Sequence, residues 1–288
     1  MTHSRRALVA LLDDAGITLG RALGQNYVAD PNTVRRIARL AGVGAGDRVV
    51  EIGAGVGSLT LALAETGAHV LAVETDRHVV PVLRRVVEGL DVEVLESDAM
   101  TFAWAAALDR APGEDGAPDR TPGEDRPWSL VANLPYNIAV PLVLDTLATV
   151  PAVGAMLVMV QREVAERLAA GPGGRVYGIP SVKRAWWASA EVVGRVPASV
   201  FVPAPRVESA LLRLQRRPPP ATALGPADVF RVVEQAFGQR RKMIRRSLGD
   251  RPDLEACAAR AGVAPDLRPE QLDLEQWVAL AEALAGVR

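Results

Sequence analysis

The sequence Arg48-Val49-Val50-Glu51-Ile52-Gly53-Ala54-Gly55-Val56-Gly57-Ser58 decides the expected fold of this chain. Its first five residues form a mostly apolar run typical of a buried strand, and three alternating glycines follow. Glycines at this point let a strand turn sharply into a helix, predicted to continue through Glu65, and let the backbone approach a ligand closely. The dinucleotide-binding pattern requires glycine or alanine where Ser58 stands, so the turn does not favour phosphate binding.

The same alternation of strand and helix continues after this turn. A strand at residues 69–73 ends in Glu74, a helix is expected at about residues 77–88, and a third strand at residues 91–95 ends near Asp98. This spacing predicts right-handed parallel crossovers. We therefore expect an α/β fold with a doubly wound parallel sheet.

The rest of the chain predicts further elements and a second domain. Other helices are expected at about residues 5–14, 32–41, 141–150, 161–170 and 181–190, and other strands at residues 128–132, 155–160, 191–200 and 210–215. Pro218-Pro219-Pro220 marks a boundary. The helices expected beyond it span about residues 226–237, 240–248, 253–261 and 269–285. We predict one domain of residues 1–217 and a small all-α domain of residues 218–288.

One segment interrupts the α/β pattern. Residues 111–127 are acidic, rich in proline and glycine, and contain Pro-Gly-Glu-Asp twice. Such a composition does not bury enough apolar surface to order itself. We interpret this segment as a flexible surface insertion without a chemical role.

Composition narrows the class of protein. The 288 residues are 49% hydrophobic but only 4% aromatic, and the net charge is −1, so the overall charge does not indicate a nucleic-acid binder. Cys257 is the only cysteine and the three histidines are scattered, so we expect neither a disulfide nor a metal site. The apolar stretch 139–160 is broken by Pro141 and Pro151. We expect a soluble cytoplasmic protein.

Two acids follow two successive strands of the predicted sheet. Glu74 comes about twenty residues after the glycine turn, where a carboxylate can accept hydrogen bonds from both ribose hydroxyls. Asp98, one strand further, can accept a hydrogen bond from an adenine amino group. The glycine turn and the two acids describe a nucleoside site that needs no phosphate, and S-adenosyl-L-methionine fits such a site.

Asn133-Leu134-Pro135-Tyr136 follows another apolar strand. An amide, a carbonyl and an aromatic ring at the carboxyl end of a strand can bind a flat base that bears an amino group, and ligands bind at that edge of open α/β sheets. These four residues alone also fit an ordinary turn.

Several segments together resemble a known family. Val49 to Ser58, Glu74, Ser97-Asp98-Ala99 and Asn133 to Tyr136 resemble the motifs of class I methyltransferases, whose sheet is Rossmann-like. More closely, Gln25 to Val28, Asn133 to Ile138 and Phe201 to Val207 are similar to the ribosomal RNA adenine dimethyltransferase family. Gln239 to Lys242 and Arg245 to Leu248 are similar to its small-subunit branch. Tyr27-Val28 in place of the family's usual Phe-Leu, Arg206 in place of Lys and the acidic insertion are departures.

The resemblance implies a role for each residue of the site. The Asn133 side-chain oxygen and the Leu134 carbonyl would accept hydrogen bonds from the target amine beside Pro135, and Tyr136 would stack on the base. Phe201 would stack on the other face, although a core position after a strand is the alternative. Gly53, Gly55, Glu74, Asp98 and Asn133 would bind the cofactor, with Asn26 and Val28 closing over its methionine end.

A basic run follows these motifs. From Arg206 to Arg246 there are ten basic residues against three acidic ones. We expect Arg206, Arg240, Arg241, Lys242, Arg245 and Arg246 to bind RNA phosphates, with a solvated charged face as the alternative.

The resemblance as a whole implies a function. It implies S-adenosyl-L-methionine-dependent dimethylation of two adjacent adenosines in small-subunit (16S) ribosomal RNA, on an immature small ribosomal subunit, by a monomer without a metal or a membrane segment. Two alternatives are open. One is methylation of large-subunit (23S) RNA that confers macrolide resistance, and the other is a non-catalytic ribosome-assembly factor. A dinucleotide-dependent enzyme is a more distant possibility.

Overall fold

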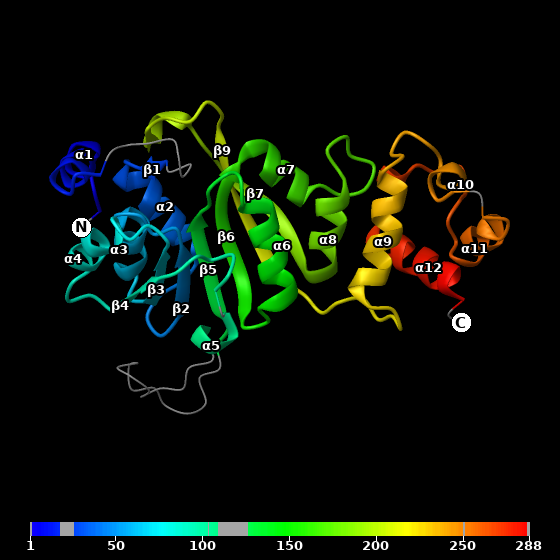
Figure 1. The fold of residues 1–288 in the computed structure, drawn as a ribbon, viewed down its shortest axis with the longest axis horizontal. Helices are drawn as coiled ribbons and strands as arrows, with labels where there is room; N and C mark the ends of the chain where they lie inside the picture. Colours follow the sequence, from blue (N-terminus) through cyan, green and yellow to red (C-terminus); the bar gives the residue numbers. More distant parts are fainter. Residues whose placement is uncertain (1, 18–25, 103, 109–125, 250, 287–288) are drawn as a thin grey trace. The chain divides into compact units, whose positions relative to one another are not determined.

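The computed structural model describes residues 2–17, 26–102, 104–108, 126–249 and 251–286. Its main element is a seven-stranded sheet of order β4-β3-β2-β5-β6-β9-β7, flanked by helices (Figure 1). The strands are β2 (Arg48–Ile52), β3 (His69–Glu74), β4 (Val92–Glu96), β5 (Trp128–Asn133), β6 (Val153–Gln161), β7 (Ala188–Val196) and β9 (Ser209–Arg216). The helices that precede and connect them are α2 (Pro31–Ala41), α3 (Ser58–Ala64), α4 (Val80–Val86), α5 (Trp104–Leu108), α6 (Ala139–Thr149), α7 (Arg162–Ala169) and α8 (Ile179–Trp187).

The pairing of the strands confirms the doubly wound α/β fold. Strands β4, β3, β2, β5 and β6 run parallel, and β9 pairs antiparallel with β6. Val49, Val50 and Val70 in the central strands are fully buried, as expected where helices cover both faces of a parallel sheet. The parallel strands end at one edge, and this edge carries the residues of the predicted site.

A second, two-stranded sheet was not predicted. In it β1 (Tyr27–Val28) pairs antiparallel with β8 (Phe201–Val202), so that Val28 lies opposite Phe201. Strands of two residues are too short to produce a periodic pattern in the sequence. This small sheet joins the segment before α2 to the segment that follows β7 and the short helix η2 (Ala198–Val200).

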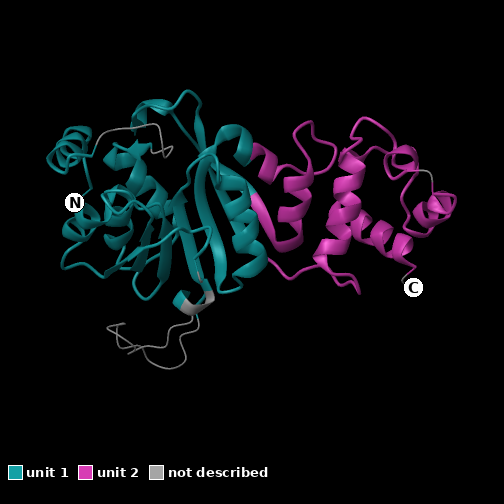
Figure 2. Ribbon diagram, viewed as in Figure 1, with its two compact units in different colours: residues 1–165, 191–215 teal, residues 166–190, 216–288 magenta. Residues whose placement is uncertain are grey.

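The chain forms two compact units, which divide it differently from the predicted domains (Figure 2). Unit 1 comprises residues 1–165 and 191–215, and unit 2 comprises residues 166–190 and 216–288. Residues 166–190 belong to unit 2 because Val182 and Trp186 of α8 pack in one core with Val229 and Val233. A sequence boundary at residues 217/218 could not show this, because the packing joins segments far apart in the chain.

Unit 2 consists mainly of helices, as predicted for the C-terminal part of the chain. They are α8, α9 (Pro226–Phe237), α10 (Ile244–Ser247), α11 (Leu254–Arg260), the short η3 (Pro269–Gln271) and α12 (Leu274–Ala285). Buried Trp277 of α12 contributes to its core. The predicted helix at residues 240–248 is shorter than expected. Its first part is a turn, in which the Lys242 amide donates to the Gln239 carbonyl, and Met243 is extended.

Arg184 fixes the segment 166–190 within unit 2. Its guanidinium is buried and donates to the carbonyls of Leu168, Ala170 and Ala188 at the ends of α7 and α8. These carbonyls are acceptors that a helix leaves without intrahelical partners. Burial lowers the pKa of Arg184 to about 10, so the side chain stays cationic at neutral pH.

The predicted acidic insertion lies almost wholly outside the described residues. Of residues 111–127 only Arg126 and Pro127 are described, and Arg126 forms an ion pair of 3.0 Å with Asp47. Gln25 of the predicted cofactor-side segment also lies outside them.

Candidate active site

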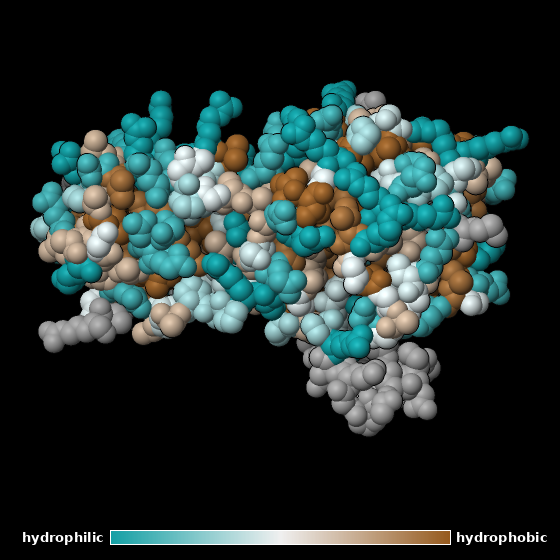
Figure 3. Space-filling view, turned by 180° about the vertical axis from the view of Figure 1, so that it is seen from behind, coloured by the Kyte–Doolittle hydropathy of each residue, from teal (hydrophilic) through white to brown (hydrophobic). Residues whose placement is uncertain are grey.

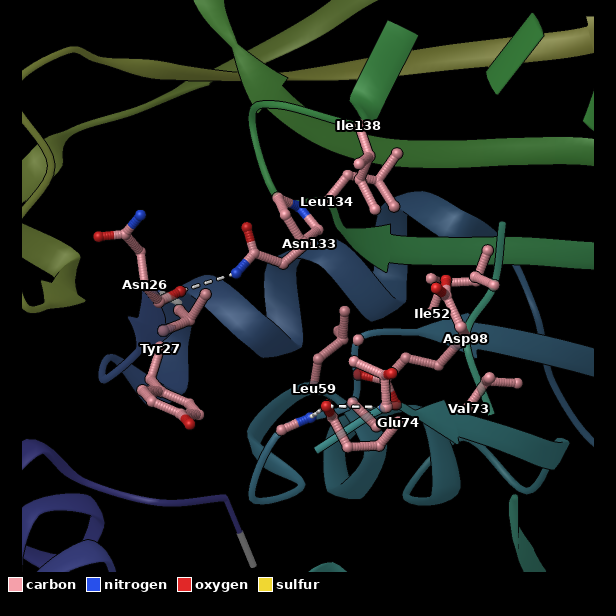
Figure 4. A pocket seen from close by; sticks show the side chains of 18 of the residues that line it. Asn26, Tyr27, Ile52, Leu59, Val73, Glu74, Asp98, Asn133, Leu134 and Ile138 are labelled. Atoms are coloured by element: carbon pink, nitrogen blue, oxygen red, sulfur yellow. Dashed lines mark hydrogen bonds between the residues drawn. The ribbon is translucent and has the colours of Figure 1, made fainter. Parts of the chain in front are cut away.

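One pocket of unit 1 brings together most of the predicted site residues (Figure 4). It lies at the carboxyl ends of β2, β3 and β5 and at the loop after β4. The predicted residues that line it are Asn26, Val28, Gly53, Gly55, Glu74, Asp98, Asn133, Leu134, Pro135 and Tyr136. These residues come from five separate segments of the sequence, and the parallel order of the strands makes four of the segments converge.

The glycine turn after β2 forms one wall of the pocket. Gly55 has a φ of +57°, which favours glycine, and a Cβ atom at this position would lie 2.9 Å from Cε1 of Tyr27. Any larger residue would therefore displace the Tyr27 ring. The absence of a side chain at Gly55 lets β1 close directly on the glycine turn.

Glu74 holds two loops of the pocket together. It is the last residue of β3 and is buried. Its Oε2 accepts from the Gly55 amide at 2.7 Å, and its Oε1 accepts from the amides of Thr75 and Asp76 at 2.9 and 3.0 Å. The carboxylate is thus fixed before any ligand binds, and Glu74 lines the pocket.

Asp98 is the more exposed of the two predicted acids. Its Oδ1 accepts from the Met100 amide at 2.9 Å, which fixes the loop after β4. Met100 also lines the pocket and its side chain is 40% exposed. A carboxylate beside an accessible apolar side chain can bind the edge and the face of a purine ring.

Asn133 has a defined orientation. It is the last residue of β5, and its Nδ2 donates to the Asn26 carbonyl at 2.9 Å (Figure 4). A carbonyl only accepts hydrogen bonds, so the amide NH₂ must face Asn26 and the side-chain oxygen must face away from it. The Leu134 amide donates to the Met159 carbonyl at 3.0 Å, which holds the following loop against β6.

Tyr136 is fixed at its hydroxyl. This hydroxyl and the Ser209 hydroxyl are 2.9 Å apart and share a hydrogen bond, and Ser209 is fully buried at the start of β9. Burial raises the pKa of Tyr136, so the phenol remains neutral at physiological pH. Ser209 could not be predicted from the sequence, because only the pairing of β9 with β6 brings it beside the loop.

The structure corrects the expected position of Phe201. Its side chain is fully buried in the core of unit 1, with Val28, Met159 and Leu211. The ring therefore does not face the pocket and cannot stack on a base in this structure. Phe201 thus has the core position that the sequence left as an alternative, and it packs with Val28 of β1.

Glu51 is a pocket residue that the sequence analysis missed. It is the last but one residue of β2, is 2% exposed, and lines the pocket. Among the described residues, its Oε2 and the hydroxyl of nearby Ser58 have no hydrogen-bond partner. Burial raises the pKa of Glu51 to about 8, and the charge of Glu74 adds to the increase. An acid within an otherwise apolar strand was the signal available in the sequence.

The predicted RNA-binding residues of unit 2 have two kinds of surroundings. Arg240 donates to the Arg175 carbonyl at 2.7 Å and lies 3.6 Å from the Glu270 carboxylate, so it joins parts of unit 2. Four others are exposed, namely Arg241, Lys242, Arg245 and Arg246. Figure 3 shows long hydrophilic side chains projecting from the edge of unit 2 at the upper left. Arg206, in unit 1, is also exposed.

The described part of the chain contains neither a metal-binding group of side chains nor a membrane-spanning helix. No three His, Cys, Asp or Glu side chains there are grouped so that they could hold a metal ion. No helix there is long and apolar enough to cross a membrane.

Fold and site together define a class of protein. The sheet is doubly wound and has a glycine turn after β2, an acid at the end of β3 and another in the loop after β4. The segment Asn-Leu-Pro-Tyr begins at the last residue of β5. This combination is that of a methyltransferase acting on an amino group of a base. The particular family follows from comparison with known proteins. The model of the ribosomal RNA adenine dimethylase family matches residues 18–286, and the chain belongs to this family.

Relatives support this assignment over almost the whole chain. A ribosomal RNA small subunit methyltransferase A of Streptomyces griseus is 45% identical over 278 residues, which are 93% of this chain and 92% of the relative. A protein of the same name from Kineococcus radiotolerans is also 45% identical, over 98% of this chain and 92% of its own length.

Solved structures show the same fold. The 23S rRNA methyltransferase ErmE has a TM-score of 0.64 and 27% identity, over 90% of this chain and all of that one. A dimethyladenosine transferase from Plasmodium falciparum has a TM-score of 0.67 at 20% identity, over 87% of this chain and 94% of that one, and it shows the fold alone.

Proposed function

We propose that this chain dimethylates two adjacent adenosines of small-subunit ribosomal RNA at their exocyclic amines, with S-adenosyl-L-methionine as methyl donor, on an immature small subunit in the cytoplasm. Relatives named for the small subunit are 45% identical, whereas the 23S enzyme is 27% identical. The observation that carries the chemical part is the hydrogen bond from Asn133 to the Asn26 carbonyl.

The pocket of unit 1 offers suitable groups for the donor. Glu74 and Asp98 would bind its ribose and adenine, with Met100 against the ring. The buried oxygen atoms of Glu51 and Ser58 that have no partner among the described residues match the charged ammonium and carboxylate of the methionine part. When bound, the donor supplies an electrophilic methyl group.

Asn133 and Leu134 would activate the target amine. The lone pair of an adenine amine is delocalised into the ring, so the nitrogen is a poor nucleophile. If the Asn133 side-chain oxygen and the Leu134 carbonyl accept its two N–H bonds, the nitrogen can become tetrahedral and direct its lone pair toward the methyl group. Orientation by fixed acceptors supplies the catalysis, without a strong base.

Tyr136 would bind the target base after it leaves the RNA stack. Its ring lines the pocket beside Asn133 and Leu134, and the hydrogen bond to Ser209 limits its orientations. Stacking of a base on an aromatic ring contributes about 1–3 kcal/mol. Because Phe201 is buried, Tyr136 carries this role without the second aromatic ring that the sequence analysis expected.

Unit 2 would bind the RNA backbone. Arg241 and Lys242 lie in the turn before α10, which we call the basic turn, and Arg245 and Arg246 lie in α10. All four are exposed. The contact of Arg240 with the Arg175 carbonyl places a further exposed arginine, Arg175, beside them. Clustered cations of this kind bind phosphates by releasing counterions.

Mapping of the methylated positions tests the proposal. The purified protein is incubated with labelled S-adenosyl-L-methionine and with unmethylated small-subunit or large-subunit particles, and the RNA is analysed by mass spectrometry. We expect dimethyladenosine at two adjacent positions of the small-subunit RNA. Methylation of the large-subunit RNA alone would establish the first alternative, and binding of small-subunit particles without methyl transfer would establish an assembly factor.

A further inference from the structure

The helix α1 (Arg5–Asp14) lies outside the residues matched by the family model, which begin at position 18. It nevertheless belongs to unit 1 and packs beside the pocket. Leu8 and Leu12 on one side of this helix are fully buried. Since this helix is additional to the part that defines the family, its contacts show what it contributes.

The buried side of α1 packs against the outer surface of the pocket wall. Leu8 and Leu12 belong to one apolar cluster with Tyr27, Val56 and Val202. Tyr27 is in β1, Val56 is in the glycine turn, and Val202 is in β8. The first two also line the pocket, so the helix packs against residues of the small sheet and the glycine turn that form the pocket wall.

Two polar side chains at the start of the helix bind the backbone of the same loops. His3 Nε2 lies 3.1 Å from the Val56 carbonyl of the glycine turn. Arg5 Nη2 donates to the carbonyls of Ser199 and Phe201, at 2.5 and 3.1 Å. Ser4 caps the helix, since its hydroxyl accepts from the Ala7 amide at 3.3 Å. The cap and the two contacts fix the helix relative to the pocket wall.

This wall connects to the residue proposed to activate the amine. Phe201 and Val28 are paired across the small sheet. The neighbouring Asn26 carbonyl accepts from Asn133 Nδ2 and determines where the Asn133 oxygen points. A displacement of β8 and β1 would therefore move the acceptor that orients Asn133.

We propose that α1 is a positioning element of the active site, in which Arg5 and His3 hold β8 and the glycine turn in the arrangement that binds the cofactor and orients Asn133. The proposal rests on the proposed function, because it requires the methyl donor to bind in this pocket. Arg5 and His3 act through the backbone of other residues and do not contact the reacting atoms.

The test compares Arg5→Ala with Arg6→Ala. Arg6 is the next residue of α1 and is exposed, and its side chain forms no hydrogen bond or ion pair with any residue that the structure describes. Both variants change the charge equally. We expect Arg5→Ala to weaken binding of S-adenosylhomocysteine roughly threefold to tenfold in calorimetry, and to slow single-turnover methyl transfer at saturating cofactor by a similar factor. Arg6→Ala should match the wild type in both measurements.

Two further measurements separate positioning from simple stabilisation. Amide hydrogen exchange of Gly55 and Val56 should become faster in Arg5→Ala, and Arg5→Lys, which can still donate to one carbonyl, should recover part of the cofactor affinity. RNA affinity should stay constant.

Wild-type cofactor affinity and transfer rate in Arg5→Ala would overturn the proposal, even with a lower melting temperature. Failure of the wild-type chain to bind S-adenosylhomocysteine or to methylate RNA would instead refute the proposed function.

Discussion

The pocket of unit 1 and the basic turn of unit 2 use charge in opposite ways. In the pocket the acids are buried or bound by backbone amides, as Glu51 and Glu74 are. In the turn, Arg241 and Lys242 are exposed to solvent. Burying a charged group costs free energy and fixes its position. An exposed charged group costs little free energy and can change its position.

This difference matches the two tasks of an enzyme that modifies RNA. Methyl transfer needs hydrogen-bond acceptors fixed within fractions of an ångström. The hydrogen bond to the Asn26 carbonyl fixes the side chain of Asn133 in this way. Attachment to a phosphate backbone needs positive charge without exact placement. Substitutions in the two regions should therefore affect different measured quantities.

The largest expected effect concerns the buried carboxyl group of Glu51. The unfolded chain loses the Glu51 proton near pH 4.5, whereas the folded chain keeps it to about pH 8. Between these values the folded state binds more protons, so this group lowers stability by about 1.4 kcal/mol for each pH unit gained. Glu51→Gln should therefore stabilise the cofactor-free protein by about 3 kcal/mol at pH 7, and by little at pH 4.5.

Urea unfolding of both proteins at several pH values measures this difference. Arg241→Gln, an exposed substitution in unit 2, serves as control and should not change stability at any of them. An equal effect of Glu51→Gln at pH 4.5 and pH 7 would show that Glu51 is not held protonated.

A second prediction concerns Asn133. Asn133→Ala removes an acceptor whose geometry matters most as the amine becomes tetrahedral. Single-turnover methyl transfer at saturating cofactor should fall roughly a hundredfold or more, with RNA affinity unchanged. A reduced RNA affinity in this variant would show that the two regions are not separate in function.

The third prediction concerns the basic turn. The double variant Arg241→Glu, Lys242→Glu should weaken binding to small-subunit particles about tenfold and flatten its dependence on salt, because fewer counterions are released. Cofactor affinity should stay constant. Arg231→Glu, elsewhere on unit 2, is the control, and an equal loss there would indicate a general effect of net charge.

The smallest expected effect concerns the hydrogen bond between Tyr136 and Ser209. Ser209→Ala should reduce kcat/KM for RNA roughly fivefold, by losing one neutral hydrogen bond, with cofactor affinity unchanged. Tyr136→Phe removes the same bond. The variant with both substitutions should therefore be no worse than either alone, and additive losses would show that the two hydroxyls act separately.

Many regular elements of both units could be predicted because their periodicity is local. The strand at 48–52 and the helices at 5–14 and 226–237 have the predicted bounds. The pairing of β1 with β8 could not be predicted, since it depends on contacts between segments far apart in the chain. For the same reason the sequence could not show that Phe201 faces the core.

The site residues divide in the same way. Residues at the carboxyl ends of strands, such as Glu74 and Asn133, could be placed because these ends converge at one edge of a parallel sheet. Ser209 and Arg240 could not, because their partners Tyr136 and Glu270 become neighbours only in the folded chain. The helix expected to begin at residue 240 begins at Ile244, because the residues before Ile244 form a turn.

The independence of methyl transfer and RNA docking is tested most directly by combining Asn133→Ala with Arg241→Glu, Lys242→Glu. The measured quantity is kcat/KM for methylation of small-subunit particles in the wild type, in each variant and in their combination. Independent steps predict that the free-energy losses add to within about 0.5 kcal/mol. A combined loss that differs from the sum by more than about 1 kcal/mol would contradict the separation of the two regions.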